Sequence, residues 1–445
     1  MPPLNDKPPS TGKAYWRSLD DLAETAEFRE LVRNEFPAFA DRLDTAHTRR
    51  SFLKLMGAST ALAGLAACRW PVEEIVPFAH RPEGFVPGAT SRYATSVERS
   101  GVAMGLLVTS VDGRPIKIEG NPNHPSSLGA TSAIDQACIL DLYDPDRSRD
   151  VIRSDGSTGR TSTWEEFAEA IAPRLDELAT REGRGLHVLA GASSSPSLAS
   201  MRARLAKRFP GMKWHEYEPT AADAPREGAR LAFGRPYRVQ PVLDEARVIV
   251  SLDEDLFLAH PAAVKLARDF ARARAADEGR MNRLYVVEST YTVTGSMADQ
   301  RIAVPASVVP AMAGVIAAEL FLRMGVALPE GFEELRPTLD RMLQYPLRSD
   351  THQPIVRDLI HHRGRSLIVA GPRQPAEVHA LVHLLNAALG NAGRTVRYTL
   401  EPGAERGTAI DEIRTLADDM QAGAVDVLLV LGGNPVFDAP VDIEL

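Results

Sequence analysis

The chain has 445 residues, enough for about three domains, so the size of the hydrophobic core is no constraint. Hydrophobic residues make up 44% and charged residues 25%, as in globular proteins, and a net charge of −8 argues against a broad nucleic-acid-binding surface. Two cysteines are too few for a disulfide framework, a four-cysteine zinc site or an all-cysteine iron–sulfur cluster.

The first predicted element is an amphipathic extension over residues 1–47. A capping-box-like start at Ser18 and Asp21 accompanies apolar residues at helical spacing, namely Leu19, Leu22, Phe28, Leu31 and Val32. A helix of this kind needs a partner surface to cover its apolar side.

Residues 48–70 have the layout of a twin-arginine export signal. An arginine pair and a Phe-Leu-Lys triplet precede a weakly apolar run of 13 residues that ends in small residues; the signal residues are Arg49, Arg50, Phe52, Leu53 and Lys54. This run is shorter than the roughly 20 residues that span a bilayer. The segment predicts export of the folded protein. A buried helix rich in Ala and Leu is the alternative.

Cys68 follows this run in the order Leu-Ala-Ala-Cys, which resembles a lipoprotein cleavage box. If Cys68 is the lipidated first residue of the mature chain, it tethers the protein to a membrane surface. The alternative is a free thiol in an uncleaved signal. Mass spectrometry of the mature N-terminus distinguishes the two.

Residues 71–139 read as a small β domain. Two apolar runs of strand type, 104–111 and 115–119, flank an Asp-Gly turn at Asp112 and Gly113, which is a strong hairpin signal. A loop over 120–125 follows, and residues 138–147 read as a helix that runs into a turn.

After residue 160 the chain alternates predicted helices with short apolar strands. The strands are uniformly apolar, as in Val427-Leu428-Leu429-Val430-Leu431, which is typical of parallel sheets covered on both faces. The expected strands are 186–190, 247–252, 284–288, 367–370, 395–400 and 426–431. The expected helices are 163–180, 196–208, 261–276, 310–323, 375–389 and 409–422. The sequence thus predicts an α/β body of two doubly wound units behind the small β unit.

The motifs of nucleotide-binding phosphate loops, zinc proteases and serine hydrolases do not occur in the sequence. Residues 191–195 (Gly-Ala-Ser-Ser-Ser) follow a strand and precede a helix, so their amides either hold an anion or form an ordinary capping turn. Residues 432–435 (Gly-Gly-Asn-Pro) end a parallel strand, where α/β folds place ligands. His361 and His362 are expected on the solvated surface.

These features together resemble the molybdopterin oxidoreductase superfamily and, within it, the export-variant branch to which the molybdopterin-type half of the alternative complex III belongs. The resemblance spans essentially the whole chain. It rests on the displaced arginine pair, the Asp-Gly hairpin and four short stretches, which are Tyr15-Trp16-Arg17-Ser18-Leu19, Glu119-Gly120-Asn121-Pro122-Asn123-His124-Pro125, Leu142-Tyr143-Asp144-Pro145-Asp146-Arg147 and Gly432-Gly433-Asn434-Pro435.

The resemblance implies that both redox centres of the superfamily are missing here. Four cysteines near the hairpin hold a [4Fe–4S] cluster in the superfamily, and the matching positions are Val97, Ser100, Met104 and Ser132. None offers a thiolate, so no iron ligand is expected. The metal-ligand position falls near Ala221, which has no donor atom, so no metal is expected. Cys138 lies beyond the fourth position and is expected to be a buried small residue.

By the layout of the superfamily, residues 140–235 and 354–445 form one discontinuous α/β domain, and residues 236–353 are inserted in it. In this branch a ferredoxin-like half with iron–sulfur clusters follows the molybdopterin-type half. That second half is absent before Leu445, so the chain is expected to be a fragment or the product of a split gene.

The function implied is that of a cofactor-free subunit of a membrane quinol:electron-acceptor oxidoreductase, exported by the twin-arginine route to the periplasmic face of the inner membrane. Implied partners are a multihaem cytochrome c, polytopic quinol-binding subunits and the iron–sulfur half, with no nucleic acid. An alternative is an exported oxidoreductase that retains a molybdopterin guanine dinucleotide. A third possibility is an exported protein that binds a small anion.

Overall fold

The computed structural model describes residues 25–27, 30, 86–99, 101–154, 156, 158–220, 222–275, 281–401, 403 and 406–443. The chain divides into two units, Met1–Gly84 and Phe85–Leu445. Within the first unit the few described residues include helical backbone at Ala26, Glu27 and Glu30. The predicted export signal, Arg49, Arg50, Phe52, Leu53 and Lys54, and the lipidation candidate Cys68 lie outside the described residues.

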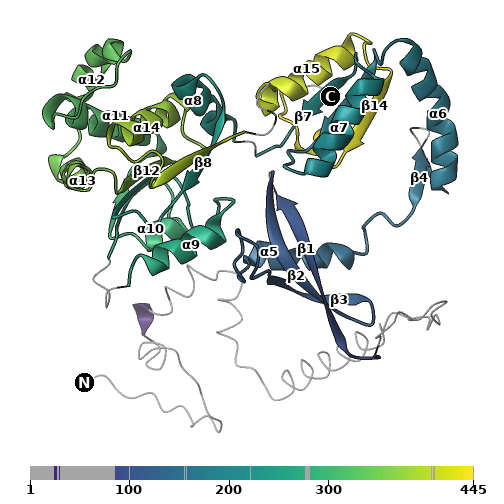
Figure 1. Cartoon of the computed structure of the whole chain (residues 1–445), viewed down its shortest axis with the longest axis horizontal. Helices are drawn as coiled ribbons and strands as arrows, with labels where there is room; N and C mark the ends of the chain where they lie inside the picture. The colour runs from purple at the N-terminus through teal and green to yellow at the C-terminus, as the bar shows by residue number, and fades with distance from the viewer. Residues whose placement is uncertain are drawn as a thin grey trace, which may run out of the picture. The chain divides into compact units, whose positions relative to one another are not determined.

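The second unit begins with a three-stranded antiparallel sheet of β1 (Thr90–Arg99), β2 (Val102–Val111) and β3 (Arg114–Gly120) (Figure 1). Asp112 and Gly113 connect β2 to β3 with φ of 50° and 82°, the left-handed backbone that a two-residue hairpin turn requires. The predicted hairpin is confirmed. Met104, Leu106 and Ile118 form its small buried core.

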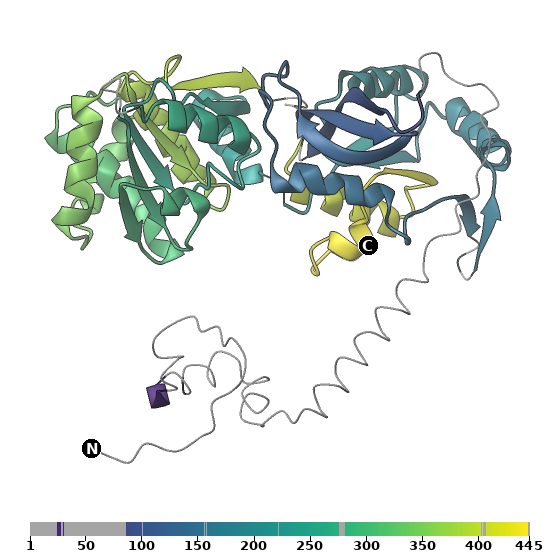
Figure 2. The same ribbon diagram turned by 90° about the horizontal axis from the view of Figure 1, so that it is seen from below.

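The loop after β3 folds back closely against the sheet. A Cβ on Gly120 would lie 2.1 Å from the carbonyl oxygen of Ala130, so only glycine fits there. Figure 2 shows the helical segment that follows, α5 (Ala133–Ala137) and the 3₁₀ helix η1 (Cys138–Leu142), beside the sheet. The helix expected from residue 138 therefore begins at residue 133 and becomes 3₁₀ at Cys138.

The first α/β lobe comprises residues 159–220 and 406–443. Its parallel sheet has the order β14-β6-β7, and a short hairpin of β4 and β5 precedes it. The strands are β4 (Val151–Ser154), β5 (Gly159–Ser162), β6 (Leu186–Ala190), β7 (Lys213–Glu216) and β14 (Val427–Leu431). The helices are α6 (Trp164–Thr180), α7 (Pro196–Arg208), α15 (Ala409–Gln421) and α16 (Pro435–Asp438).

Helices cover both faces of this sheet. On one face Leu189 of β6 packs with Ile413 and Leu416 of α15. On the other face Leu186 packs with Leu178 of α6 and with residues that border α7. Burial on both faces explains why the strands read as continuous apolar runs.

The second α/β lobe comprises residues 222–275 and 281–401. Its four-stranded parallel sheet has the order β11-β10-β9-β12, and β8 pairs separately with β13. The strands are β8 (Tyr237–Pro241), β9 (Val248–Leu252), β10 (Arg283–Glu288), β11 (Gln300–Ala303), β12 (Ser366–Ala370) and β13 (Val396–Leu400). The helices are α8 (Asp223–Phe233), α9 (Ala263–Arg272), α10 (Val293–Ser296), α11 (Val309–Ala318), α12 (Arg336–Met342), α13 (Ser349–His361) and α14 (Ala376–Ala388), with short helical turns η3 (Ala306–Val308), η4 (Glu319–Arg323) and η5 (Glu333–Leu335).

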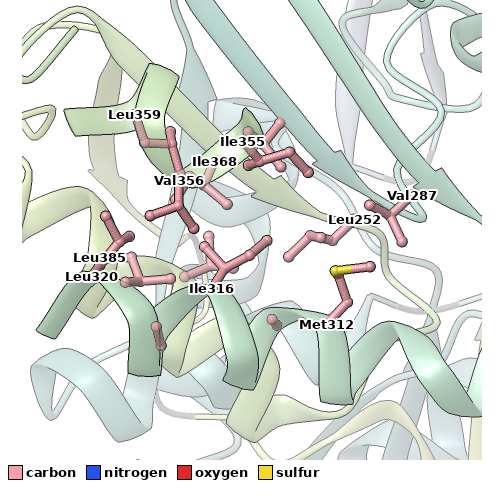
Figure 3. Packing of buried hydrophobic residues seen from close by; sticks show 14 of the residues in the cluster. Leu252, Val287, Met312, Ile316, Leu320, Ile355, Val356, Leu359, Ile368 and Leu385 are labelled. Atoms are coloured by element: carbon pink, nitrogen blue, oxygen red, sulfur yellow. The ribbon is translucent and has the colours of Figure 1, made fainter. Parts of the chain in front are cut away.

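The larger core of this lobe lies between the sheet and α11. Figure 3 shows Met312 and Ile316 of α11 directed at Leu252, Val287 and other apolar side chains of the sheet and of α13. Within the described residues, the helical stretch Ala306–Arg323 has the length and hydropathy of a membrane span, but 61% of it is buried in this core. The stretch is thus weak evidence for a membrane helix.

The α/β fold class with parallel sheets, predicted from the sequence, is confirmed. The expected domain boundary at residue 354 does not match the sheets, because β12 pairs with β9 and β13 pairs with β8. Residues 366–400 therefore belong with the segment expected as an insertion, 236–353. Backbone pairing decides which sheet an apolar strand joins, and the sequence pattern of a buried strand is the same in both sheets.

Helices α8 and α14 approach closely at Gly228. We expect Gly228→Ala to lower the free energy of unfolding by about 1–3 kcal/mol, because the new Cβ would lie 2.3 Å from the Cβ of His379 and 2.7 Å from the carbonyl oxygen of Ala376. Helix propensity alone predicts the opposite sign, a gain of about 1 kcal/mol. Urea denaturation measures the difference.

Gly314→Ala in α11 is the matched control. Its Cβ would meet the flexible side chain of Met342, which can move, so a smaller loss is expected. Equal losses in the two variants would contradict the close approach of α8 and α14.

Candidate functional site

A cavity of about 890 Å³ opens at the carboxyl ends of the parallel strands. Residues that follow β7, β9, β10 and β12 line it, and so do α8, β8 and α14. In the second lobe β9 lies between β10 and β12, so the chain leaves β9 toward one side and returns on the other. Such a switch point is where open α/β sheets bind ligands. The cavity is therefore the candidate site.

The loop after β6, which was singled out from the sequence as an anion site or a capping turn, holds carboxylates of the chain itself. Glu98 of β1 accepts hydrogen bonds from Ser193 Oγ at 2.7 Å and from Ser194 Oγ at 2.9 Å, and also one from the amide of Ser194. Glu218 accepts a hydrogen bond from the amide of Ala192 at 3.0 Å. Burial alone would raise the pKa of Glu98, but these hydrogen bonds lower it on balance. The loop before α7 thus already donates its hydrogen bonds to carboxylates of the chain.

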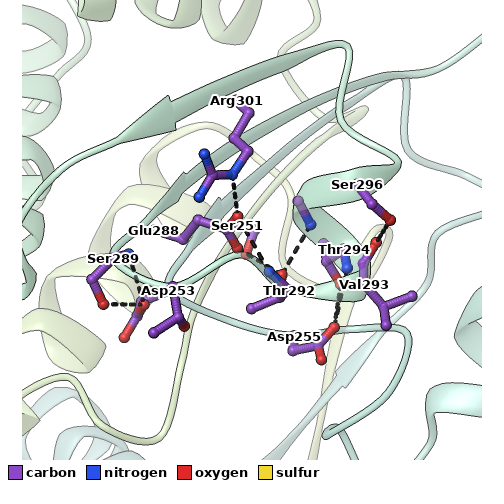
Figure 4. Close-up of polar contacts among 12 residues, drawn as sticks. Ser251, Asp253, Asp255, Glu288, Ser289, Thr292, Val293, Thr294, Ser296 and Arg301 are labelled. Carbon is purple, nitrogen blue, oxygen red and sulfur yellow. Dashed lines mark hydrogen bonds and ion pairs between the residues drawn. The ribbon is translucent and has the colours of Figure 1, made fainter. Parts of the chain in front are cut away.

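The same arrangement recurs after β10 in the second lobe (Figure 4). Glu288 accepts a hydrogen bond from Thr292 Oγ1 at 2.6 Å and pairs with Arg301. Asp255 accepts one from Thr294 Oγ1 at 2.8 Å and one from the amide of Thr294 at 3.2 Å. Carboxylates of the chain therefore also accept the hydrogen bonds that the hydroxyls and amides of this loop donate.

The loops after β9 and β12 touch each other at Gly371. The amide of Gly371 donates to the carbonyl of Leu252 at 2.9 Å, and a Cβ there would lie 1.9 Å from the backbone oxygen of Asp253. Asp253 has a φ of 62° and accepts a hydrogen bond from Gln374 Nε2 at 3.1 Å. A non-glycine residue in left-handed conformation is uncommon and clusters at functional sites.

The cations of the cavity wall are already paired. Arg238 makes a two-point contact with Glu401, at 2.8 and 3.0 Å, and Arg406 lies 3.1 Å from Glu216. Arg226 is buried and donates to the carbonyl of Gly407 at 2.9 Å. These guanidinium groups bind carboxylates and carbonyls of the chain, so an added anion would compete with those groups for the guanidinium groups.

Several titratable groups of the wall are buried without charge partners. Burial, with smaller effects from Asp255 and Asp253, raises the pKa of Glu254 to about 8. Burial also lowers the pKa of His379 and of His383 to about 4. The Nε2 atoms of both imidazoles are buried and have no hydrogen-bond partner among the described residues.

The degenerate cluster positions fall into ordinary structural roles. Val97 and Met104 are cross-strand partners in β1 and β2, and both belong to the small β core. Ser132 caps α5, since its hydroxyl accepts from the amide of Asp135 at 3.1 Å while Asp135 accepts from the amide of Ser132. Ser100 lies outside the described residues, as does Ala221. The structure brings Val97 and Met104 together and assigns Ser132 to a capping box.

The remaining candidates lie away from the described cavity wall. Cys138 is half-buried rather than buried, and packs at the edge of the β core. His361 is exposed at the end of α13, as expected, whereas His362 is half-buried and its Nδ1 lies 3.0 Å from the carbonyl oxygen of Asp358. Gly432 and Gly433 both have a φ of 76° and are exposed beyond β14.

The sequence analysis missed the carboxylates that fill the loops, Glu98, Glu218, Glu288 and Asp255. Three of them left a signal, because Glu218, Asp255 and Glu288 follow or end parallel strands and so lie at the carboxyl edge of a sheet. Glu98 reaches its loop from β1, 95 positions earlier in the chain than Ser193, and no local pattern predicts that contact.

No family model matches the chain. Over 140 residues it is 35% identical to the menaquinone reductase, molybdopterin-binding-like subunit, of Nitratidesulfovibrio vulgaris, a match that covers 30% of this chain and 20% of that protein. Among solved structures it is similar to acetylene hydratase from Pelobacter acetylenicus, with a TM-score of 0.48 and 14% identity over 66% of this chain and 43% of that chain. It is also similar to the formyltransferase/hydrolase complex FhcABCD from Methylorubrum extorquens, with a TM-score of 0.39 and 16% identity over 64% of this chain and 78% of that chain. The chain thus matches about a fifth of the length of its menaquinone reductase relative.

Proposed function

We propose that the chain is a non-catalytic, molybdopterin-oxidoreductase-like subunit of a membrane-bound quinol:electron-acceptor oxidoreductase, of the alternative complex III type. The similarity to a menaquinone reductase subunit supports the link to quinone chemistry over 140 residues. The export-signal pattern at Arg49 and Arg50 supports a place on the periplasmic face of the inner membrane, with Cys68 as a lipid anchor. The proposed partners are a multihaem cytochrome c, polytopic quinol-binding subunits and a ferredoxin-like iron–sulfur half.

The observation that carries the cofactor-free part of the proposal is the filling of the loops by carboxylates. A molybdopterin guanine dinucleotide is anionic and would need the amides and cations at the carboxyl edges of the sheets. Here Glu98 and Glu218 accept from the loop after β6, and Arg238 and Arg406 are paired with carboxylates. A phosphate at these positions would displace a carboxylate or be repelled by it. The residues present do not fit the dinucleotide.

The residues near the hairpin also do not fit a [4Fe–4S] cluster. Val97 has no donor atom, and the thioether of Met104 lies in an apolar core, 6% exposed. Iron–sulfur clusters are held by thiolates. Electron transfer in the proposed complex therefore runs through the partner subunits, and this chain acts as a scaffold.

The test is to purify the protein with its partners from its own host and to quantify molybdenum, tungsten, pterin and the subunits that co-purify. We expect no molybdenum, tungsten or pterin bound to this chain, together with co-purification of haem-containing and membrane subunits. Stoichiometric pterin with either metal would overturn the cofactor-free assignment. Purification without any partner would overturn the assignment to a complex.

A double variant tests whether Glu98 and Glu218 keep anions out of the loop after β6. Glu98→Gln combined with Glu218→Gln removes both negative charges but keeps the side-chain shape. We expect the double variant to gain affinity for inorganic pyrophosphate in calorimetric titration, whereas the wild type shows none. Glu119→Gln on β3, whose carboxylate pairs with Lys117 outside the cavity wall, is the matched control. Pyrophosphate binding by the wild type would contradict the proposal.

A further inference from the structure

Two histidines and an aspartate converge beneath α15 in the first lobe. His187 of β6 and His215 of β7 are each 3% exposed, and Asp419 of α15 is 19% exposed. Nδ1 of His187 lies 3.1 Å from Nε2 of His215 and 3.9 Å from Oδ2 of Asp419. One ligand atom from each residue lies within 4.8 Å of the other two. This cluster is separate from the cavity.

The spacing fits a small divalent cation. Zinc binds imidazole nitrogen and carboxylate oxygen at about 2.0–2.2 Å, so the ligand atoms of a tetrahedral site lie about 3.3 Å apart. The 3.1 Å between the two histidine nitrogens meets this value, and a modest shift of Asp419 closes the remaining 3.9 Å. We propose that His187, His215 and Asp419 form a binding site for a borderline divalent cation such as Zn²⁺.

The surroundings of His215 are an independent argument for this site. Metal-binding histidines usually donate their other ring N–H to a carboxylate, which fixes the ring. Oε2 of Glu412 lies 3.2 Å from Nδ1 of His215, close enough for such a bond to form after a small reorientation, and Glu412 is itself held by the amide of Gly407 at 3.0 Å. The ring of His215 therefore directs Nε2 at His187.

The carboxylate of the cluster already holds a cation of the chain. Lys213 now holds Asp419 at 2.6 Å, but its side chain is 50% exposed and can turn toward solvent when a metal takes its place.

The expected role is structural. The ligands join the neighbouring strands β6 and β7 to α15, which comes much later in the chain, and the histidines are closed off from solvent. A bound ion would cross-link α15 to the sheet in the way that structural zinc sites contribute folding free energy.

The experiment uses the full chain without a histidine tag, freed of metal by a chelator. Titration with Zn²⁺ against a chelating dye and with Co²⁺ by visible absorption gives stoichiometry, affinity and geometry. We expect one ion per chain, the intense visible bands of a tetrahedral cobalt site, and a rise in melting temperature on zinc addition. His215→Gln and Asp419→Asn are expected to weaken binding by more than about 100-fold, and Glu412→Gln by about 10–100-fold.

The matched control is the double variant His361→Gln/His362→Gln, which removes two histidines from the end of α13 outside the cluster. It should bind zinc as the wild type does. No binding by the wild type would overturn the proposal and leave a hydrogen-bonded pair of buried imidazoles, His187 and His215. Binding that survives Asp419→Asn and His187→Gln, or cobalt spectra with a thiolate band, would place the ion elsewhere and overturn it as well. Circular dichroism of each variant checks that it is folded.

Discussion

Glu254→Gln is expected to stabilise the protein by about 5 kcal/mol at pH 9, with no comparable gain at pH 4. The folded-state pKa of Glu254 is raised from 4.5 to about 8, so the folded protein keeps a proton that the unfolded chain loses. Stability therefore falls as the pH rises from about 4.5 to about 8, by about 1.4 kcal/mol per pH unit. Glutamine fills the same space without a proton to lose, so the variant lacks this fall.

Unfolding by urea at several pH values measures the effect. The matched control is Glu245→Gln, the same chemical change at a side chain that is 52% exposed. The control should keep the alkaline fall of the wild type. Parallel pH profiles for wild type and Glu254→Gln would show that Glu254 ionises in the folded protein as it does in the unfolded chain.

Local patterns were sufficient to predict most elements of the two lobes. The Asp112-Gly113 turn, the helix 163–180 and the strands 186–190 and 426–431 depend on nearest-neighbour chemistry. The structure has α6 at Trp164–Thr180, β6 at Leu186–Ala190 and β14 at Val427–Leu431. Short strands with mixed composition were missed, among them Lys213–Glu216 and Gln300–Ala303. Their alternation is too brief to be distinguished from a loop.

The sequence predicted where the candidate site lies, but not which side chains fill it. Parallel strands place ligand-binding loops at their carboxyl ends, so the loop at residues 191–195 could be singled out from the sequence. What fills that loop could not, because Glu98 reaches it from another sheet. The same limit explains the boundary at residue 354, since the choice of β9 as the partner of β12 is a long-range contact.

The second large effect is expected on the acid side and has the opposite sign. The pKa of His379 and that of His383 are lowered from 6.5 to about 4, chiefly by burial. Between these pH values the unfolded chain therefore binds protons at both histidines and the folded protein does not. The stability that these neutral imidazoles allow is complete above pH 6.5 and is lost as the pH falls toward 4. A shift of this size corresponds to about 3 kcal/mol for each histidine.

The double variant His379→Gln/His383→Gln should therefore have a flatter acid limb than the wild type, whatever its stability at pH 7. The measurement is the slope of the unfolding free energy against pH between 4 and 6.5. Each proton that binds only to the unfolded chain contributes about 1.4 kcal/mol per pH unit to this slope. His361→Gln at the exposed end of α13 is the control and should keep the wild-type slope. Because Glu254 acts in the opposite direction up to pH 8, the wild type is expected to be most stable near pH 6.5. An unchanged acid slope in the double variant would mean that both imidazoles take up protons in the folded protein as they do in the unfolded chain.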